Sequence, residues 1–207
     1  MARAAEENIP LNKRSFKIIL CGGCGVGKTS IYTRLKDEHF EDIESKTVVP
    51  DQCIINLTTN KNVEVKVTLW DTAGLEKFDS VTHSYFSDSH LVLIVYSTDK
   101  KESLDQAVKY KNEASNHALG AHLVLVQNKI DLKDSAAISE QEVKNFLKSN
   151  DFKLSFKISA KTGDGIKEMK KKLADHLHKY GKKCKKKSGT VNLENSQSTT
   201  KKCCRQQ

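Results

Sequence analysis

Proline and long apolar runs are scarce in this 207-residue sequence, and each scarcity excludes a class of protein. Two prolines and ten glycines are too few for collagen-like or low-complexity architecture. The longest strongly apolar run, residues 91–96, falls far short of the roughly 20 residues that a transmembrane helix needs. Residues 1–7 contain no apolar core of a secretion signal, so we expect that the chain is not secreted.

The six cysteines, without such a signal, indicate reduced thiols in the cytoplasm rather than a disulfide framework. Cys21 and Cys24 have the spacing of a redox or zinc motif. No second pair with this spacing completes a tetrahedral zinc site, and both residues belong to a glycine-rich stretch. We therefore interpret this pair as incidental.

Positive charge is concentrated at one end of the chain. The formal net charge is +9, and residues 181–207 contain eight Lys or Arg and one Glu, a net of +7. Residues 1–180 are therefore close to neutral, so the basic total does not predict nucleic-acid binding by the folded part. A basic appendage of this kind favours a membrane surface or a flexible tether.

Apolar runs that alternate with helical patterns predict a three-layer α/β domain over residues 16–180. A strand is expected wherever a short run is apolar throughout or on alternate positions, as in residues 16–20, 63–69, 91–96, 123–126 and 152–158. Helices are expected between these strands.

Two helices have clear signals of their own. Ser139 and Glu142 form a capping box that opens a helix. The last helix has an apolar stripe from Ile166 to Tyr180, and Gly181 is expected to end it. We interpret His176, on the outer side of that helix, as plain surface. Residues 1–15 and 181–207 are too polar to bury a core, so we expect both to be disordered.

Residues 22–29, GGCGVGKT, match the phosphate-binding pattern G-x-x-x-x-G-K-[ST] between a strand and a helix. Glycines let successive backbone N–H groups converge on phosphate oxygens, and the helix N-terminus adds partial positive charge. Lys28 is expected to span the β- and γ-phosphates, and the Thr29 hydroxyl to bind Mg²⁺. A plain glycine turn is the alternative, but it does not explain the Lys-Thr pair.

Asn128-Lys129-Ile130-Asp131 follows a buried strand, so its side chains are expected at the ligand-binding edge of the sheet. A carboxylate there accepts both N1–H and N2–H of guanine, a donor pair that adenine lacks. Alone, this motif could be a loop that caps a helix, but downstream of a phosphate loop it indicates guanine. Ser159-Ala160-Lys161 fits a second base-binding loop. Asp71, at the end of another strand, can hold Mg²⁺ through water, and Gly74 N–H can meet a γ-phosphate.

These motifs occur in the order and spacing of a Ras-superfamily small GTPase, which residues 16–180 resemble throughout. The chain is most similar to the Rab branch in Trp70-Asp71-Thr72-Ala73-Gly74, in Tyr85-Phe86 and in its paired C-terminal cysteines. The resemblance implies a P-loop G domain with a mostly parallel six-stranded sheet and helices on both faces, followed by a disordered basic tail. It also implies binding of GTP or GDP with Mg²⁺ and hydrolysis of GTP.

The resemblance assigns the site residues. It implies that the metal is held by Thr29, Thr47 and Asp71, that Phe40 packs on the guanine ring, and that Thr47 senses the γ-phosphate. It implies that Lys28, Thr47, Gly74 and position 75 act in the hydrolysis of GTP. The nucleotide contacts that it implies are Gly23, Cys24, Gly25, Val26, Gly27, Lys28, Thr29, Ser30, Phe40, Thr47, Gly74, Asn128, Lys129, Asp131, Ser159, Ala160 and Lys161.

Three positions depart from the family pattern. Leu75 stands where the family usually has a glutamine that orients the attacking water, so we expect very slow intrinsic hydrolysis. Two explanations stay open. Either the leucine is a natural change, tolerated because an activator supplies a glutamine and an arginine, or it is an engineered substitution that keeps the protein bound to GTP. Cys24 replaces the usual small residue of the phosphate loop with little expected effect. Val49 and Gln52 replace a glycine and an aromatic, which alters the expected partner surface around Trp70 and Tyr85.

Cys203 and Cys204 resemble the Rab ending in which both cysteines are geranylgeranylated, and residues 182–187 add basic charge for anionic lipid. A CaaX reading that starts at Cys204 ranks second, because its middle residues are not aliphatic. The resemblance therefore implies a cytoplasmic protein on the cytosolic face of endomembranes or the plasma membrane.

The function implied is a Rab-like switch in vesicle traffic that binds effectors through its switch segments. The alternative is a scaffold that stays bound to GTP because of Leu75. A P-loop ATPase is disfavoured by Asn128 and Asp131. The expected partners are effectors, an exchange factor, a GTPase-activating protein, a dissociation inhibitor (GDI) and a prenyltransferase escort, with no nucleic acid.

Overall fold

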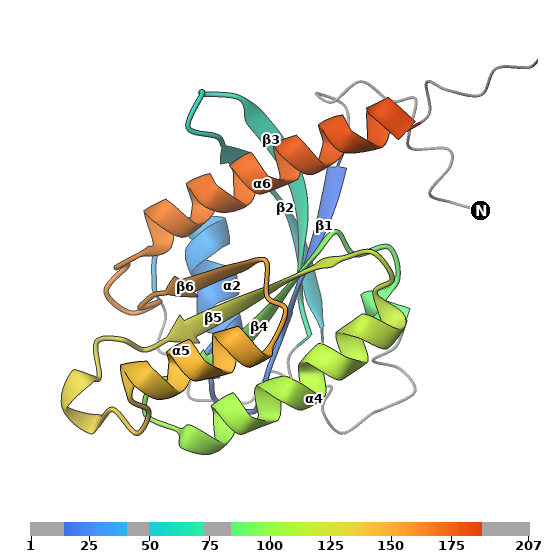
Figure 1. Cartoon of the computed structure of the whole chain (residues 1–207). Coiled ribbons are helices and arrows are strands. Elements are labelled where there is room, and N and C mark those ends of the chain that lie inside the picture. Colours follow the sequence, from blue (N-terminus) through green and yellow to red (C-terminus); the bar gives the residue numbers. More distant parts are fainter. Residues whose placement is uncertain (1–14, 41–49, 73–83, 188–207) are drawn as a thin grey trace, which may run out of the picture.

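The chain forms a six-stranded sheet with helices on both sides (Figure 1). The computed structural model describes residues 15–40, 50–72 and 84–187. The strands are β1 (Ser15–Cys21), β2 (Asp51–Thr58), β3 (Glu64–Asp71), β4 (Leu91–Ser97), β5 (His122–Asn128) and β6 (Leu154–Lys157). The helices are α2 (Lys28–Asp37), α4 (Lys101–His117), α5 (Glu140–Ser149) and α6 (Ile166–Lys187), with a 3₁₀ turn at Lys133–Ser135.

The strand order is β2-β3-β1-β4-β5-β6, and only the β2–β3 pair is antiparallel within this sheet. Every residue of β4 is buried, as are the last five of β5. A strand that is buried on both faces needs helices above and below it. The predicted α/β class and the mostly parallel six-stranded sheet are therefore confirmed.

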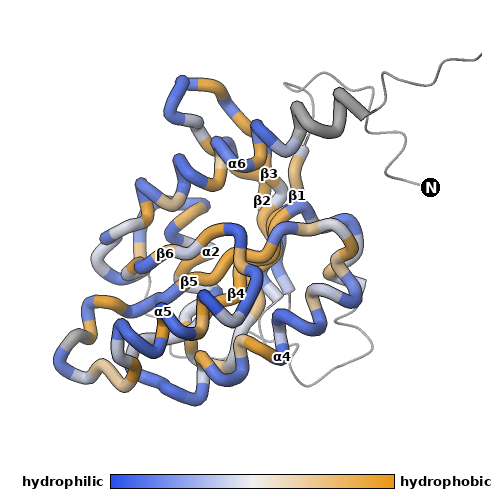
Figure 2. The backbone as a smooth tube through the Cα atoms, viewed as in Figure 1, coloured by the Kyte–Doolittle hydropathy of each residue, from blue (hydrophilic) through white to orange (hydrophobic). Residues whose placement is uncertain are grey.

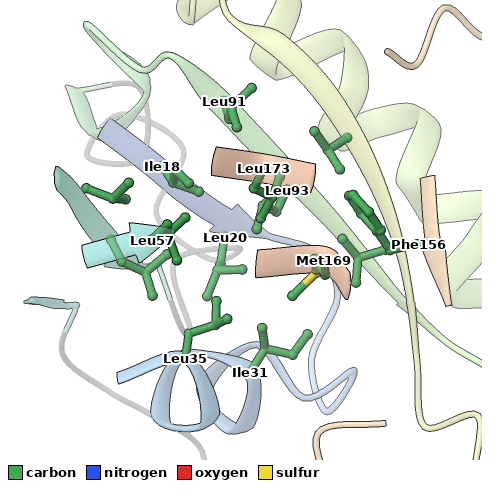
Figure 3. Close-up of a cluster of buried hydrophobic side chains, with 14 of the residues drawn as sticks. Ile18, Leu20, Ile31, Leu35, Leu57, Leu91, Leu93, Phe156, Met169 and Leu173 are labelled. Carbon is green, nitrogen blue, oxygen red and sulfur yellow. The ribbon is translucent and has the colours of Figure 1, made fainter. Parts of the chain in front are cut away.

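Two hydrophobic cores lie on opposite faces of the sheet. One packs the sheet against α2 and α6 and contains Ile31, Leu35, Met169 and Leu173 (Figure 3). The other packs it against α4 and α5 and contains Leu104, Ala107 and Val143. Figure 2 shows the hydrophobic positions gathered on the central strands, with hydrophilic residues along the outer sides of the helices.

The predicted capping box at the start of α5 is confirmed. Ser139 Oγ accepts a hydrogen bond from Glu142 N at 3.2 Å, and Glu142 Oε2 accepts one from Ser139 N at 2.9 Å. Lys101 Nζ lies 2.8 Å from Glu142 Oε1 and ties the start of α4 to α5. That hydrogen bond, with those from Ser139, lowers the pKa of Glu142 to about 2.

Helix α6 does not end at Gly181, as the sequence analysis expected, but continues to Lys187. A glycine inside a helix costs only about 1 kcal/mol relative to alanine, and the lysines that follow it are good helix formers. Among the described residues, no helix is both long and apolar enough to cross a membrane. The predictions for residues 1–14 and 188–207 fall outside the described residues.

His176 is not plain surface, contrary to expectation, because it is half-buried in a cluster of rings between α6 and the strands. Its Nε2 lies 2.6 Å from Nδ1 of His122 at the start of β5. Tyr180 stacks edge-on against His122 and His90, with ring centroids 5.2 and 5.8 Å away, and His90 contacts Phe16 at 5.1 Å. This cluster holds the second half of α6 against the amino ends of the strands.

Candidate nucleotide-binding site

The predicted motifs meet at the carboxyl edge of the sheet. The glycine-rich loop 22–27 joins β1 to α2, Asp71 ends β3, Asn128 ends β5, and loop 159–161 follows β6. Because β1, β3, β5 and β6 run parallel, the ends of all four strands lie on the same side of the sheet. Ligands of open α/β sheets bind at this edge.

Glycine is required at two positions of the loop. Gly22 has a φ of 145°, and a Cβ there would lie 2.2 Å from Val95 O. Gly27 has a φ of 91°, and a Cβ there would lie 2.3 Å from Asn128 Nδ2. Gly27 is also the N-cap of α2 and offers no side chain to its first N–H groups. The N-terminus of α2, with its partial positive charge, therefore lies at the loop where the motif predicts an anion.

The ammonium of Lys28 is held inside the curve of the loop. Its Nζ donates hydrogen bonds to Gly22 O at 2.8 Å and Gly23 O at 2.9 Å, and the residue is only 6% exposed. These two hydrogen bonds fix the position of Lys28 Nζ. Lys28 therefore lies at the loop where the motif predicts phosphate oxygens, and its contact with phosphate stays a prediction.

Thr29 and Asp71, the predicted metal ligands, lie side by side and are joined by a hydrogen bond. Thr29 Oγ1 donates to Asp71 Oδ2 at 2.6 Å, and Asp71 is 1% exposed. Hydroxyl and carboxylate oxygens suit Mg²⁺, which usually completes its shell with water and substrate phosphates. The described residues contain no cluster of three His, Cys, Asp or Glu side chains that would hold a metal alone. The hydroxyl of Thr29 and the carboxylate of Asp71 fit a magnesium ion whose other ligands are phosphate oxygens and water.

The side chain of Asn128 connects the glycine-rich loop to loop 159–161, the predicted second base-binding loop. Its Nδ2 donates to Val26 O at 2.9 Å, and its Oδ1 accepts from Ala160 N at 3.0 Å. Asp131 Oδ1 accepts from Ser159 Oγ at 2.5 Å. Residues that are about 130 positions apart in the sequence therefore build one site, and one carboxylate oxygen of Asp131 is fixed by its neighbour.

Lys129 has a left-handed backbone with a φ of 61°, a conformation that costs energy for a non-glycine residue. Its Nζ lies 3.8 Å from Asp99 Oδ2, and Ser97 Oγ donates to the other oxygen of Asp99. Burial raises the pKa of Asp99, but the Ser97 hydrogen bond and the charge of Lys129 outweigh burial and lower it. Asp99 thus stays ionised and orients Lys129.

Asp99 and Arg34 belong to the site but were missed by the sequence analysis. Asp99 lies in the turn after β4, and Arg34 lies on α2 between Thr33 and the buried Leu35. Neither residue belongs to a spaced motif, so no sequence signal singled them out. Only the three-dimensional packing brings them beside Lys129 and the loop 159–161.

Trp70 and Tyr85 lie together on the surface next to the site. Their ring centroids are 5.6 Å apart, and Lys17 Nζ lies 4.8 Å from the centroid of the Trp70 ring. Gln52 is exposed and pairs with Trp70 across the β2–β3 ladder. Phe40 is partly buried against the larger core. Gln52, which replaces an aromatic residue of the expected partner surface, therefore lies beside Trp70.

Of the other predicted contacts, Cys24 is exposed and Ser30 is half-buried near the start of α2. Five predicted residues lie outside the described part of the chain, so their roles stay predictions. These residues are Thr47, Gly74, Leu75, Cys203 and Cys204.

Comparison with known proteins gives one consistent result. The model of the Ras family matches residues 17–179. The Ras-related protein Rab-26 of Bos taurus is 35% identical over 151 residues, which cover 72% of this chain and 58% of Rab-26. The Ras-related proteins Rab-30 of Homo sapiens and Rab-12 of Mus musculus are 32% and 31% identical, over 78% and 86% of this chain. These matches cover 79% of Rab-30 and 74% of Rab-12.

Proposed function

Because this chain belongs to the Rab branch of the Ras-superfamily GTPases, which hydrolyse GTP, we propose that it is a guanine-nucleotide switch on cytosolic membrane surfaces. In this role it controls effector binding in vesicle traffic. The observation that carries the proposal is Asn128, whose amide joins the phosphate loop to the base loop beside Asp131. This arrangement provides phosphate and guanine contacts on one rigid sheet edge.

In the proposed complex, the backbone N–H groups of residues 23–30 and the ammonium of Lys28 bind the phosphates. Thr29 and Asp71 hold Mg²⁺, together with Thr47. When bound, the metal neutralises charge on the β- and γ-phosphate oxygens. Because Lys28 and Asp71 are already buried in fixed positions, little reorganisation is needed when the nucleotide arrives.

Guanine is selected by the second half of the site. The Asp131 carboxylate accepts N1–H and N2–H of the base, Lys129 covers the ring, and loop 159–161 contacts the far edge. Adenine would leave the carboxylate without these donors, which costs a large factor in affinity. Phe40 packs against the ring from the other side.

The switch itself depends on contacts from Thr47 and Gly74 to the γ-phosphate. Loss of that phosphate releases both contacts, and the two segments that carry them then become less ordered. Effectors then distinguish the two states at a surface that includes Trp70 and Tyr85. An exchange factor, a GTPase-activating protein, a GDI and a prenyltransferase escort are the further partners proposed.

The single tryptophan, Trp70, is expected to report this switch. It stacks on Tyr85 and directly precedes Asp71, the proposed metal ligand. Exchange of bound GDP for a non-hydrolysable GTP analogue should therefore change its fluorescence intensity. The measurement is a fluorescence titration, with ATP as the control nucleotide that leaves the signal unchanged. An equal signal in both guanine-nucleotide states would contradict a switch at this surface.

Leu75 favours slow intrinsic turnover within this function, because leucine neither donates nor accepts a hydrogen bond to water. A second candidate function follows from that one residue. The protein would then bind effectors as a scaffold that stays loaded with GTP. An activator that supplies its own glutamine would instead let it cycle normally.

The paired cysteines provide the proposed membrane anchor. Two geranylgeranyl chains give stable attachment, whereas one chain binds reversibly, at about 0.8 kcal/mol for each buried CH₂. A Cys203→Ser/Cys204→Ser double variant should therefore move to the soluble fraction of fractionated cells, and each single variant should be partly released. If Cys203→Ser alone has no effect, Cys204 acts as a CaaX-type acceptor. Persistent membrane association of the double variant would argue against prenylation.

A further inference from the structure

Arg34 makes three hydrogen bonds that its place on α2 does not require. Its Nε donates to Ala160 O at 2.8 Å, and its Nη2 donates to Lys161 O at 2.7 Å. Its Nη1 donates to Glu38 O, also at 2.7 Å. The planar guanidinium thus satisfies three backbone carbonyls from two separate segments, an arrangement that suits arginine and not lysine.

Both backbone polar groups of Ala160 are hydrogen-bonded to side chains. Asn128 Oδ1 accepts its N–H at 3.0 Å, while Arg34 binds its carbonyl. Ser159, the residue before it, is fixed to Asp131 through its hydroxyl. The base loop is thus tied to the guanine motif on its inner side and to Arg34 on its outer side.

Glu38 is the second segment that Arg34 binds. It ends α2 with a φ of 62° and lies two residues before Phe40. Its carbonyl accepts from Arg34, while its carboxylate lies 2.9 Å from Lys170 Nζ on α6. One side chain therefore links the base loop to the stretch of chain that leads to Phe40.

We propose that Arg34 is a positioning residue for the guanine base, acting through the loop 159–161 and the end of α2. The inference rests on the proposed function, because it assumes that the base binds between Asp131, that loop and Phe40. Within the part of the chain that the structure describes, the hydrogen bonds of Arg34 go to Ala160, Lys161 and Glu38, and none goes to the phosphate loop, Thr29 or Asp71. Its effect should therefore be confined to the base end of the site.

The test is the dissociation rate of a fluorescent GDP analogue from the full chain. Arg34→Gln should speed release at least about tenfold, equivalent to about 1.4 kcal/mol. Arg34→Lys should lie between this variant and the parent, because an ammonium cannot reach three carbonyls in one plane. Two controls should match the parent. Lys36→Gln removes an exposed charge from the same helix, and Lys170→Ala removes the ion pair with Glu38 but leaves the Arg34 hydrogen bonds in place.

The dependence of release on Mg²⁺ concentration separates positioning from general loosening. The concentration that gives a half-maximal effect should be the same in Arg34→Gln and the parent, because Thr29 and Asp71 lie at the other end of the site. Unchanged release from Arg34→Gln would overturn the proposal, and so would a shifted Mg²⁺ dependence. Parental affinity for GDP in both Asp131→Asn and Lys28→Ala would instead overturn the proposed function, so the two failures are distinguishable.

Discussion

Asp131→Asn is expected to lower the affinity for GDP by a factor of about 10⁴. The guanine N1–H and N2–H both need an acceptor, and an amide offers only one oxygen and replaces the other with a donor. Ser159 Oγ bonds Asp131 Oδ1 at 2.5 Å, and the amide oxygen of asparagine can still accept that bond. The fold should therefore survive, and the loss should be confined to the base.

The measurement is equilibrium competition between GDP and a fluorescent guanine nucleotide. Asp134→Asn is the matched control, since Asp134 is exposed in the 3₁₀ turn that follows and the substitution is the same. Lys28→Ala provides an independent test at the phosphate end of the site. If the affinity for GDP stays at the parental level in both Asp131→Asn and Lys28→Ala, the assignment of this site is wrong.

Leu75→Gln is expected to raise the rate of GTP hydrolysis by about 10- to 100-fold in the absence of any activator. Glutamine can both donate to and accept from the attacking water, whereas leucine can do neither. Poor placement of a reacting group by about 1 Å can cost a factor of about 10². The affinities for GTP and GDP should stay the same, because side chain 75 is assigned to the water and not to the base or the metal.

Single-turnover hydrolysis of preloaded GTP measures this effect. The parent and the variant are compared with and without a GTPase-activating protein of the Rab type, and Leu75→Met is the matched control that adds no polar group. Slow parental turnover that the activator does not rescue would identify a persistent GTP state. Normal parental turnover with the activator would show that the water is positioned from outside, and the scaffold alternative would be wrong.

The sequence predicted the parts of the fold that local patterns determine. The apolar run of residues 91–96 predicted a strand buried on both faces, and these residues form most of β4, which is buried throughout. The Ser139–Glu142 pair predicted the start of α5 correctly because a capping box is a contact between near neighbours. The phosphate loop was found because its glycines meet a backbone requirement that no other residue meets.

The features that the sequence did not predict depend on contacts between distant segments. Arg34 binds carbonyls 126 and 127 residues away, and a backbone carbonyl leaves no trace in the residue type that carries it. His176 looked like a surface residue because its partner, His122, lies on another element. The end of α6 was misplaced for a different reason. A single glycine is a weak stop signal when helix-forming lysines follow it.

The two opposed cores limit how this protein can vary. In β1, Ile18 and Leu20 point into one core, while Ile19 and Cys21 point into the other, and the loop begins at the next residue. An insertion of one residue within β1 would move the side chains that follow it to the opposite faces of the sheet, and it would turn the loop away from Asn128. We therefore expect that insertions and deletions are not tolerated near the junction of β1 with the loop, even where many substitutions are tolerated.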